Sequence, residues 1–579
     1  MILKMKSVLH NIRDNWKIRS GIVLIVAMAW LSILFGADSF FTPYLLVAML
    51  GLMACVRDTD SEAVPRRERL YRILFAAFFS LTVVLANYKL ISPVRDHVPE
   101  GLVLLGGGLL IGWLVLKLSL EMEIRSCHPT PARKKAAGCF WLLFLLFSLV
   151  YLSALVFCYR PGILSPDSVS QIWQNVNKIY SNHHPYWHTM IIKVCMDLGM
   201  SVFHDINQAV MVYSVFQAIG MSAIFAFLGM TVYEAGAPGI IMAMTAAFYA
   251  FLPYHILYSI TMWKDILFAG SVALFICAMY RILKGIDSKI VNTITLTAGG
   301  LGCCLLRSNG MAAFVFTFLV FLIFLWKEKK KVLFLLLFVI AASYVLKHPV
   351  LEKRGVTQPD TVEFLSIPVQ QVARVIVEGE ELEEDERELI GQIMEIEAVK
   401  EKYAAYISDP IKNLIRDTNP DYLDAHKQEY LMLWIRLGLK HPALYVKAWI
   451  DQTRGFWNGG YMNYVVKPIV EENEYGIYMT DQKNIVARAM TKWVYMFFNH
   501  PAFEVFRSIG LHVWGLILCV IVLLIRKRKE ALLFVLPIAI ILTLFISTPV
   551  YAEFRYSYAI FTPIPLLLYA AFEEHHVPS

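Results

Sequence analysis

Charged side chains stand directly beside the ends of apolar segments at four separate places in this chain. These residues are Asp167, Lys264, Asp265, Arg307, Glu553 and Arg555. Charge at membrane depth is costly and usually has a task. Taken singly, each of these residues is more often a snorkelling anchor or a member of a local ion pair. Because four connections share the pattern, we expect the six side chains to converge on one site.

The residue types at these positions suit one kind of reaction. A carboxylate can accept the proton of an attacking hydroxyl group. Cations can stabilise the charge that builds up on a departing phosphate. Glycosyl transfer from a lipid-phosphate donor needs both, at the boundary between lipid and water. A simpler interpretation of the first position is structural, because Ser165 or Asp167 can cap the helix that follows.

The composition places these residues in a membrane protein. Of the 579 residues, 58% are hydrophobic and 17% are charged, which excludes a soluble enzyme, a fibrous protein and a disordered one. We predict an all-α fold, a polytopic transmembrane helical bundle of about 14 spans with a mainly helical extracytoplasmic domain. The predicted spans are 21–36, 39–56, 73–92, 101–118, 139–158, 208–231, 238–257, 264–281, 291–306, 310–326, 332–346, 508–525, 531–548 and 556–572.

The positive-inside rule orients this bundle. With the N-terminus in the cytoplasm, every strong Lys/Arg cluster falls on the cytoplasmic side, as the rule requires. The C-terminus is then cytoplasmic too, and the two long polar segments are extracytoplasmic. The clusters lie at residues 57–69, 125–135, 281–289, 327–331 and 526–529.

The spans and loops divide the chain into four predicted regions. Residues 1–138 form a four-span region, and residues 139–346 form a transmembrane core whose outer loop, 159–207, carries Asp167. Residues 347–506 form the extracytoplasmic domain, in which helical spacing over 421–457 is broken at His441 and Pro442. A three-span region, 507–579, completes the chain.

Three short motifs resemble the GT-C superfamily of integral-membrane glycosyltransferases, which use polyprenyl-phosphate-linked sugars. An acidic motif follows a span, a His-Pro motif lies later in the same loop, and an Arg-Tyr pair followed by prolines opens a late span. In this chain the motifs are Ser165-Pro166-Asp167-Ser168, His183-His184-Pro185-Tyr186, and Arg555-Tyr556 with Pro563 and Pro565. The three motifs occur in the same order as in that family. The resemblance is to a bacterial branch related to the mannosyl- and aminoarabinosyltransferase type.

This resemblance implies roles for particular residues. Asp167 is expected to be the general base of an inverting transfer, and Arg555 is expected to bind the donor phosphate. Position alone adds Lys264 and Arg307 as phosphate-binding candidates. Residues expected to orient the substrates are His183, His184, Asp265, Tyr556 and Glu553.

The expected partners follow from the same resemblance. They are a polyprenyl-phosphate sugar, membrane lipid and an acceptor of open identity (a glycan, a lipid or a protein), with no nucleic acid. The expected location is the bacterial cytoplasmic membrane. No cofactor and no metal are predicted. His184 and His188 are four residues apart, but Pro185 lies between them and a zinc site needs more ligands. Asp167 and Asp265 are the carboxylates that a divalent ion would use.

Three other functions stay open at this point. A transporter or flippase would depend on mid-span polar residues such as Ser214 or Gln217. A polysaccharide polymerase or ligase would use a lipid-diphosphate glycan and would need Arg555 and His184 more than Asp167. A membrane scaffold would use the acidic run 378–388 to contact a partner.

Overall fold

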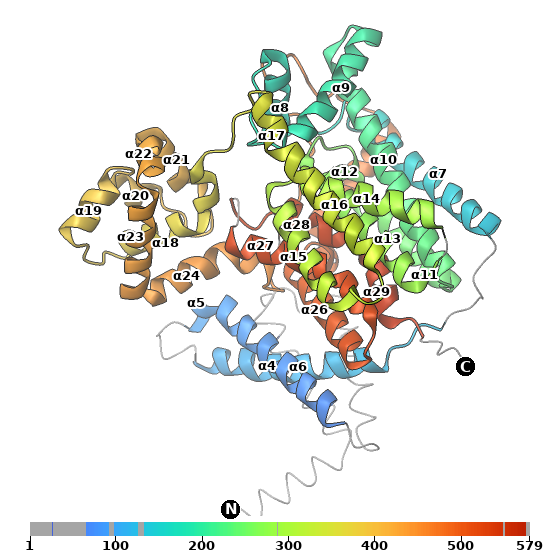
Figure 1. Cartoon of the computed structure of the whole chain (residues 1–579), viewed down its shortest axis with the longest axis horizontal. Coiled ribbons are helices and arrows are strands. Elements are labelled where there is room, and N and C mark those ends of the chain that lie inside the picture. Colours follow the sequence, from blue (N-terminus) through green and yellow to red (C-terminus); the bar gives the residue numbers. More distant parts are fainter. Residues whose placement is uncertain are drawn as a thin grey trace, which may run out of the picture. The chain divides into compact units, whose positions relative to one another are not determined.

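The computed structural model describes residues 26, 30, 65–91, 98–125, 133–286, 288–461, 463–547 and 550–574. Within these residues the protein is all-α, with isolated β-bridges and no sheet (Figure 1). The chain divides into two compact units. Unit 1 is Met1–Glu123, Arg454–Asn463 and Phe498–Ala531, and unit 2 is Ile124–Thr453, Tyr464–Phe497 and Leu532–Ser579. All the predicted site residues belong to unit 2.

Eight helical segments in the described residues are long and apolar enough to cross a membrane, and a ninth candidate is a bent pair. The pair is α11 (Gly239–Phe251) with α12 (Pro253–Ser259), bent by 55°. The eight segments are α4 (Arg66–Ala86), α6 (Val98–Glu121), α7 (Arg133–Phe157), α10 (Ile206–Glu234), α13 (Lys264–Lys284), α15 (Ser308–Leu325), α16 with α17 (Lys330–Lys353) and η6 with α27 (Lys529–Ile546).

The predicted number of about 14 spans is not confirmed. Two of the predicted spans, 21–36 and 39–56, lie outside the described residues, except for residues 26 and 30. The apolar helices α14 (Lys289–Leu305) and α26 (Ile509–Ile525) have only 17 residues each and are not among the eight candidates; this length is at the lower end of the range of about 17–25 residues that crosses a bilayer core. The last apolar segment is broken near Pro563 into α28 (Phe554–Phe561) and α29 (Ile564–Phe572), as expected for a proline inside a helical run.

The long segment after α17 contains a bundle of short helices, which we call the helical domain (residues 361–453; gold to orange in Figure 1). The predicted helix break is confirmed, because α23 ends at Lys440 and α24 begins at Pro442. Apolar side chains from its helices form one buried cluster. Its elements are η3 (Thr361–Leu365), α18 (Ser366–Val377), α19 (Glu384–Gly391), α20 (Ile396–Lys402), α21 (Asp409–Thr418), α22 (Pro420–Ala425), α23 (Lys427–Lys440) and α24 (Pro442–Thr453).

The acidic run 378–388 is used partly inside this domain. Asp385 pairs with Arg436 at 2.7 Å, and the fully buried Glu386 pairs with Lys440 at 2.7 Å. Both cations lie on α23, so these carboxylates join α19 to α23. This accounts for part of the run without an external partner.

The two ends of α13 have different surroundings. Lys264 begins the helix, and Lys284 ends it, where its ammonium group is 2.6 Å from a Glu573 carboxylate oxygen. The ammonium group of Lys329 donates to the carbonyl of Ile282 at 3.3 Å, which brings two predicted cytoplasmic clusters together at that end. A helix of 21 residues is about 30 Å long. Lys264 therefore lies a full helix length away from these basic residues.

Candidate functional site

The segment that carries Asp167 is held between two other parts of unit 2. The backbone of Ile163 pairs with residues 260–262, with N···O distances of 3.0 and 2.9 Å. The backbone of the next residue, Leu164, pairs with residues 469–471 at 3.1 and 3.0 Å. Because the first partner leads directly into Lys264, the pairing sets the acidic segment beside the N-terminus of α13.

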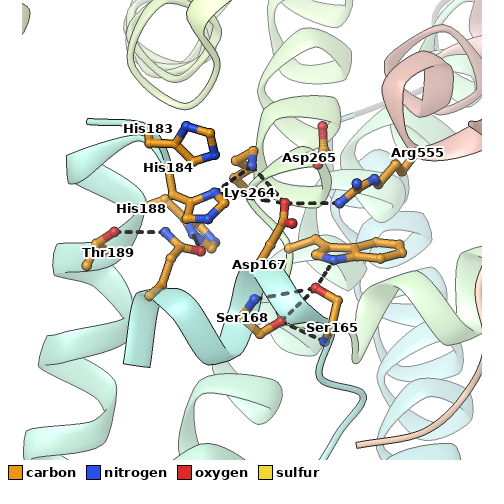
Figure 2. A network of polar contacts seen from close by, with 12 residues as sticks. Ser165, Asp167, Ser168, His183, His184, His188, Thr189, Lys264, Asp265 and Arg555 are labelled. Carbon is orange, nitrogen blue, oxygen red and sulfur yellow. Dashed lines mark hydrogen bonds and ion pairs between the residues drawn. The ribbon is translucent and has the colours of Figure 1, made fainter. Parts of the chain in front are cut away.

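Side chains complete this attachment. Ser165 caps α8 (Pro166–Asn177) and forms a capping box with Ser168, so the capping prediction is confirmed for Ser165. The Ser168 hydroxyl also donates to the Met262 carbonyl at 2.6 Å, and the Trp263 indole N–H donates to the Ser165 hydroxyl. Asp167 follows in the first turn of the helix, and its carboxylate faces Lys264 and Arg555 (Figure 2).

Two cations and a histidine surround one oxygen of the Asp167 carboxylate. The Lys264 ammonium group lies 2.8 Å from Oδ2 and the Arg555 Nη1 atom lies 3.0 Å from it. Lys264 also contacts Nδ1 of His184 at 3.0 Å, and that nitrogen is 3.9 Å from Oδ2. Arg555 pairs through Nε with Glu553 as well. The structure thus brings together residues from four positions along the chain (Figure 2).

Aromatic rings fix the guanidinium group of Arg555. The Cζ atom lies 4.9 Å from the ring centre of Trp263 and 4.9 Å from that of Tyr556. Nη2 also donates to the Tyr556 hydroxyl at 3.1 Å. Stacking and hydrogen bonds together leave this side chain little rotational freedom, which favours a preorganised anion site.

Arg307 and Asp265 form a second pair beside the first. Their Nη1 and Oδ1 atoms are 2.8 Å apart, and both side chains are buried. Arg307 also donates to the Tyr556 carbonyl at 3.3 Å and lies 5.1 Å from that ring's centre. Asp265 does not line the cavity described next, so its contact with Arg307 indicates a positioning role.

Most of the predicted site residues line one cavity of about 810 Å³. Its lining combines the ion cluster (Asp167, His184, Lys264, Glu553 and Arg555), the ends of α15 and α27, and two elements of the helical domain. Candidate site residues in the lining are Asp167, His183, His184, Lys264, Arg307, Glu553, Arg555 and Tyr556. Other lining residues include Ala312, Glu363, Phe364, Asp409, Lys412, Arg416, Thr543 and Ile546.

The charges in the cluster set its protonation. Burial raises the pKa of Asp167, but the positive charges of Lys264 and Arg555 outweigh burial and hold that pKa well below its usual range. Burial and the neighbouring Lys264 lower the pKa of His184 well below 6.5. Burial raises the pKa of Glu553. At neutral pH the cluster therefore holds an ionised Asp167 and a neutral His184.

A buried polar network supports the site and has no signal in the sequence motifs. Gln171 contacts Nδ1 of His188 at 3.0 Å, and Nε2 of His188 contacts the Tyr213 hydroxyl at 2.8 Å. That hydroxyl donates to Gln217, whose amide donates to the backbone carbonyls of residues 258, 259 and 261 at 2.7–3.2 Å. The network fixes the segment that ends at Lys264 against α8, α9 (Tyr186–Phe203) and α10.

His188 and the mid-span polar residues make contacts inside unit 2. Both ring nitrogens of His188 contact side chains of the network. Ser214 packs against Gly162, where a Cβ atom would lie 2.1 Å from the Ser214 hydroxyl. In the part of the chain that the structure describes, no group of three or more His, Cys, Asp or Glu side chains is placed to hold a metal ion.

Comparison with protein families matches residues 171–578 to a family of unknown function, DUF6020, and the chain belongs to this family. The matched region begins just after Asp167 and includes the other candidate site residues. Comparisons with curated proteins and with solved structures found no match.

Proposed function

We propose that this member of the DUF6020 family is a membrane glycosyltransferase, which transfers a sugar from a polyprenyl-phosphate donor to an acceptor by an inverting displacement. One observation carries the proposal. Lys264 and Arg555 both lie within 3.0 Å of Oδ2 of Asp167, although up to 388 residues separate them in the chain. The three side chains line a cavity that two candidate spans also line. A carboxylate for proton transfer and two cations for a phosphate are the groups that the reaction requires.

The reaction can be written on these residues. An acceptor hydroxyl oxygen attacks the anomeric carbon of the donor sugar, and its proton passes to the Asp167 carboxylate. The bond between the anomeric carbon and the phosphate oxygen breaks, and polyprenyl phosphate leaves with the bonding electrons. Lys264 and Arg555 stabilise the charge on the leaving phosphate, which needs no proton of its own. Arg307 adds a further positive charge to the same cavity.

The ion pairs around Asp167 indicate how donor binding assists the base. Without a donor, Lys264 and Arg555 both bind Oδ2, which weakens the carboxylate as a base. The donor phosphate, a diester with one negative charge, competes with the carboxylate for the same two cations, and it gains a second negative charge as its bond to the sugar breaks. As the cations shift towards the phosphate, the pKa of Asp167 rises towards its ordinary value. The base thus becomes effective when the donor is in place.

The proposed reaction face is extracytoplasmic. The basic residues 281–284 and 329 lie at the opposite end of α13 from Lys264. If the positive-inside rule holds, that basic end is cytoplasmic and the cavity opens on the other side. Reporter fusions within residues 178–183 and 284–289 test this orientation. We expect a reporter that is active outside the cytoplasm to work at the first position, and a reporter that is active in the cytoplasm to work at the second. The reverse result would refute the proposed location.

The apolar part of the cavity wall suits the lipid part of the donor. Ala312 of α15 and both Thr543 and Ile546 of α27 line the cavity, and Ile546 is 76% exposed. Both helices are candidate spans. A lipid chain can therefore lie along them while its phosphate reaches Arg555.

The activity is tested with the full chain in lipid nanodiscs. A panel of polyprenyl-phosphate sugars is added together with an extract of bacterial envelope glycans and lipids, and released polyprenyl phosphate is measured by mass spectrometry. This product is the same whatever the sugar and the acceptor. We expect release by the wild-type protein, loss in Arg555→Ala, and normal release in Lys193→Ala, which removes a cation on the exposed part of α9. No release from any donor would refute the proposal.

The same assay separates the alternatives. A polymerase or ligase that uses lipid-diphosphate donors would release polyprenyl diphosphate instead. A transporter or flippase would consume no donor. A scaffold would tolerate Arg555→Ala but would fail when the acidic run 378–388 is deleted.

A further inference from the structure

One part of the cavity wall comes from the helical domain and not from the ion cluster. Besides Ile407, this part of the lining holds Glu363 and Phe364 on η3, and Asp409, Lys412 and Arg416 on α21. We call these five residues the domain wall. The sequence motifs and the family match assign it no role.

Ion pairs within the helical domain neutralise the cations of the domain wall. The Lys412 ammonium group lies 2.8 Å from Asp409 and 3.3 Å from Glu363, and its side chain is only 1% exposed. Arg416 contacts Glu363 at 2.7 Å and Asp360 at 2.8 Å. Within the domain wall two carboxylates thus face two cations, and Asp360, outside the cavity lining, adds a third carboxylate. The wall has no excess positive charge, which disfavours an anionic ligand there and leaves rigidly held carboxylate oxygens to accept hydrogen bonds.

Phe364 adds an apolar surface beside these oxygens. Its side chain is 53% exposed, whereas Val362 on the same short helix is 1% exposed and Leu365 packs against the domain's apolar cluster. The exposed ring therefore offers the cavity an apolar face beside carboxylate oxygens, a combination typical of small-molecule sites. A sugar ring matches the combination, because its C–H face can pack on the aromatic ring while hydroxyl groups at its edge donate to carboxylates.

We propose that the domain wall is a binding site for a neutral saccharide, and that the acceptor of the transfer is therefore a glycan. Phe364 stacks against one sugar ring, and Glu363 and Asp409 accept hydrogen bonds from its hydroxyl groups. This inference rests on the proposed function, because the wall shares the cavity with Asp167. The bound saccharide presents a hydroxyl group towards that carboxylate.

The first test measures saccharide binding without transfer. The full chain in nanodiscs is applied to an array of bacterial envelope oligosaccharides, using wild type, Phe364→Ala, Phe364→Trp and Tyr406→Ala. Tyr406 is a matched control, because it belongs to the same domain, is 51% exposed and does not line the cavity. We expect binding by wild type, Phe364→Trp and Tyr406→Ala, and at least a tenfold weaker signal for Phe364→Ala. Absence of binding by wild type, or equal binding by Phe364→Ala, would overturn the proposal.

The second test separates this site from the transfer reaction. With a polyprenyl-phosphate sugar that the wild type consumes, free sugar formed by hydrolysis and glycan-linked sugar are measured in parallel. We expect Phe364→Ala to lower transfer at least tenfold and to leave hydrolysis within twofold of wild type. Equal loss of both would assign Phe364 to the donor or to membrane contact and overturn the proposal. Saccharide binding without any donor consumption would refute the proposed function and leave this site standing.

Discussion

Replacing Asp167 by asparagine perturbs the site at the atom on which the proposed mechanism depends. The amide has nearly the same shape, but it cannot accept the proton of an acceptor hydroxyl group. It also removes the negative charge that Lys264 and Arg555 share at 2.8 and 3.0 Å. The variant therefore tests catalysis and the ion cluster together, and the two effects have different sizes.

The magnitudes can be worked from the contacts. Loss of a general base lowers a rate by about 10²–10⁴-fold, which corresponds to about 3–5.5 kcal/mol at 1.36 kcal/mol per decade. Hydrogen bonds to charged groups stabilise a protein by about 1.5–3 kcal/mol each. Arg555 keeps Glu553 as a partner, and the Asp167 side chain is 22% exposed. Solvent screening therefore lowers the expected cost in folding stability to about 1–3 kcal/mol for the two contacts together.

The assay compares Asp167→Asn with Asp197→Asn. Asp197 lies on α9, pairs with Lys193, and is 64% exposed, so its loss changes a charge without touching the cavity. Polyprenyl phosphate release and thermal unfolding are measured for both proteins in nanodiscs. We expect at least a 100-fold loss of release for Asp167→Asn alone. A well-folded Asp167→Asn protein with release within twofold of wild type would refute the assignment of the base.

Three further outcomes follow from the same geometry. Arg555→Lys should lower polyprenyl phosphate release by about tenfold or more, because each charged hydrogen bond is worth about 1.5–3 kcal/mol. An ammonium group cannot reproduce the separate guanidinium contacts to Asp167, Glu553 and the Tyr556 hydroxyl. Release equal to wild type would show that positive charge alone suffices. Gly162→Ala should lower the unfolding free energy by about 1–3 kcal/mol, because the backbone φ is +133° and a Cβ would lie 2.1 Å from Ser214 Oγ. Gly138→Ala, which lies in α7 and meets nothing within 4 Å, should leave the thermal unfolding temperature unchanged or raise it, because alanine is more favourable than glycine in a helix. Because the pKa of Asp167 is lowered in the folded protein, its carboxylate should stabilise the fold at pH values above its unfolded-state pKa of about 3.9 and lose that contribution as the pH falls through the folded-state pKa. The stability gap between wild type and Asp167→Asn should therefore shrink below about pH 4, and a gap that widens there would contradict the shift.

Charge next to apolar segments was the informative signal for the site. Asp167, Lys264, Arg307 and Arg555 could be selected because charge at membrane depth is costly and four separate connections share the pattern. Neighbouring residues could not be separated in this way. Lys264 and Asp265 are adjacent, but successive residues of a helix point about 100° apart. Only the fold shows that Lys264 reaches the cavity and that Asp265 turns to Arg307.

Other supporting residues cannot be assigned their contacts from the local sequence. Trp263 lies beside an apolar run, and Gln217 could be selected as a mid-span polar residue but without its partners. Their roles depend on partners far away in the chain, Arg555 for Trp263 and residues 258–261 for Gln217.

The fold class followed from composition, but the number of spans did not. Hydropathy records how apolar a segment is and not whether one helix continues through it. The segment from 238 to 257 bends by 55° where α12 begins at Pro253, and the last segment breaks near Pro563. The helical domain was predicted better, because the break between α23 and α24 is encoded locally by a proline.

The most direct test of the central claim is a cryo-electron microscopy structure of the chain in nanodiscs with a polyprenyl phosphate, the proposed leaving group, for which undecaprenyl phosphate serves as the probe. The account predicts phosphate density within hydrogen-bond distance of Lys264 and Arg555, with at least one of these cations drawn away from Asp167 Oδ2. It also predicts that the lipid chain leaves the cavity along α15 and α27. A phosphate bound elsewhere, or a cavity that stays empty at saturating lipid with both ion pairs intact, would contradict it.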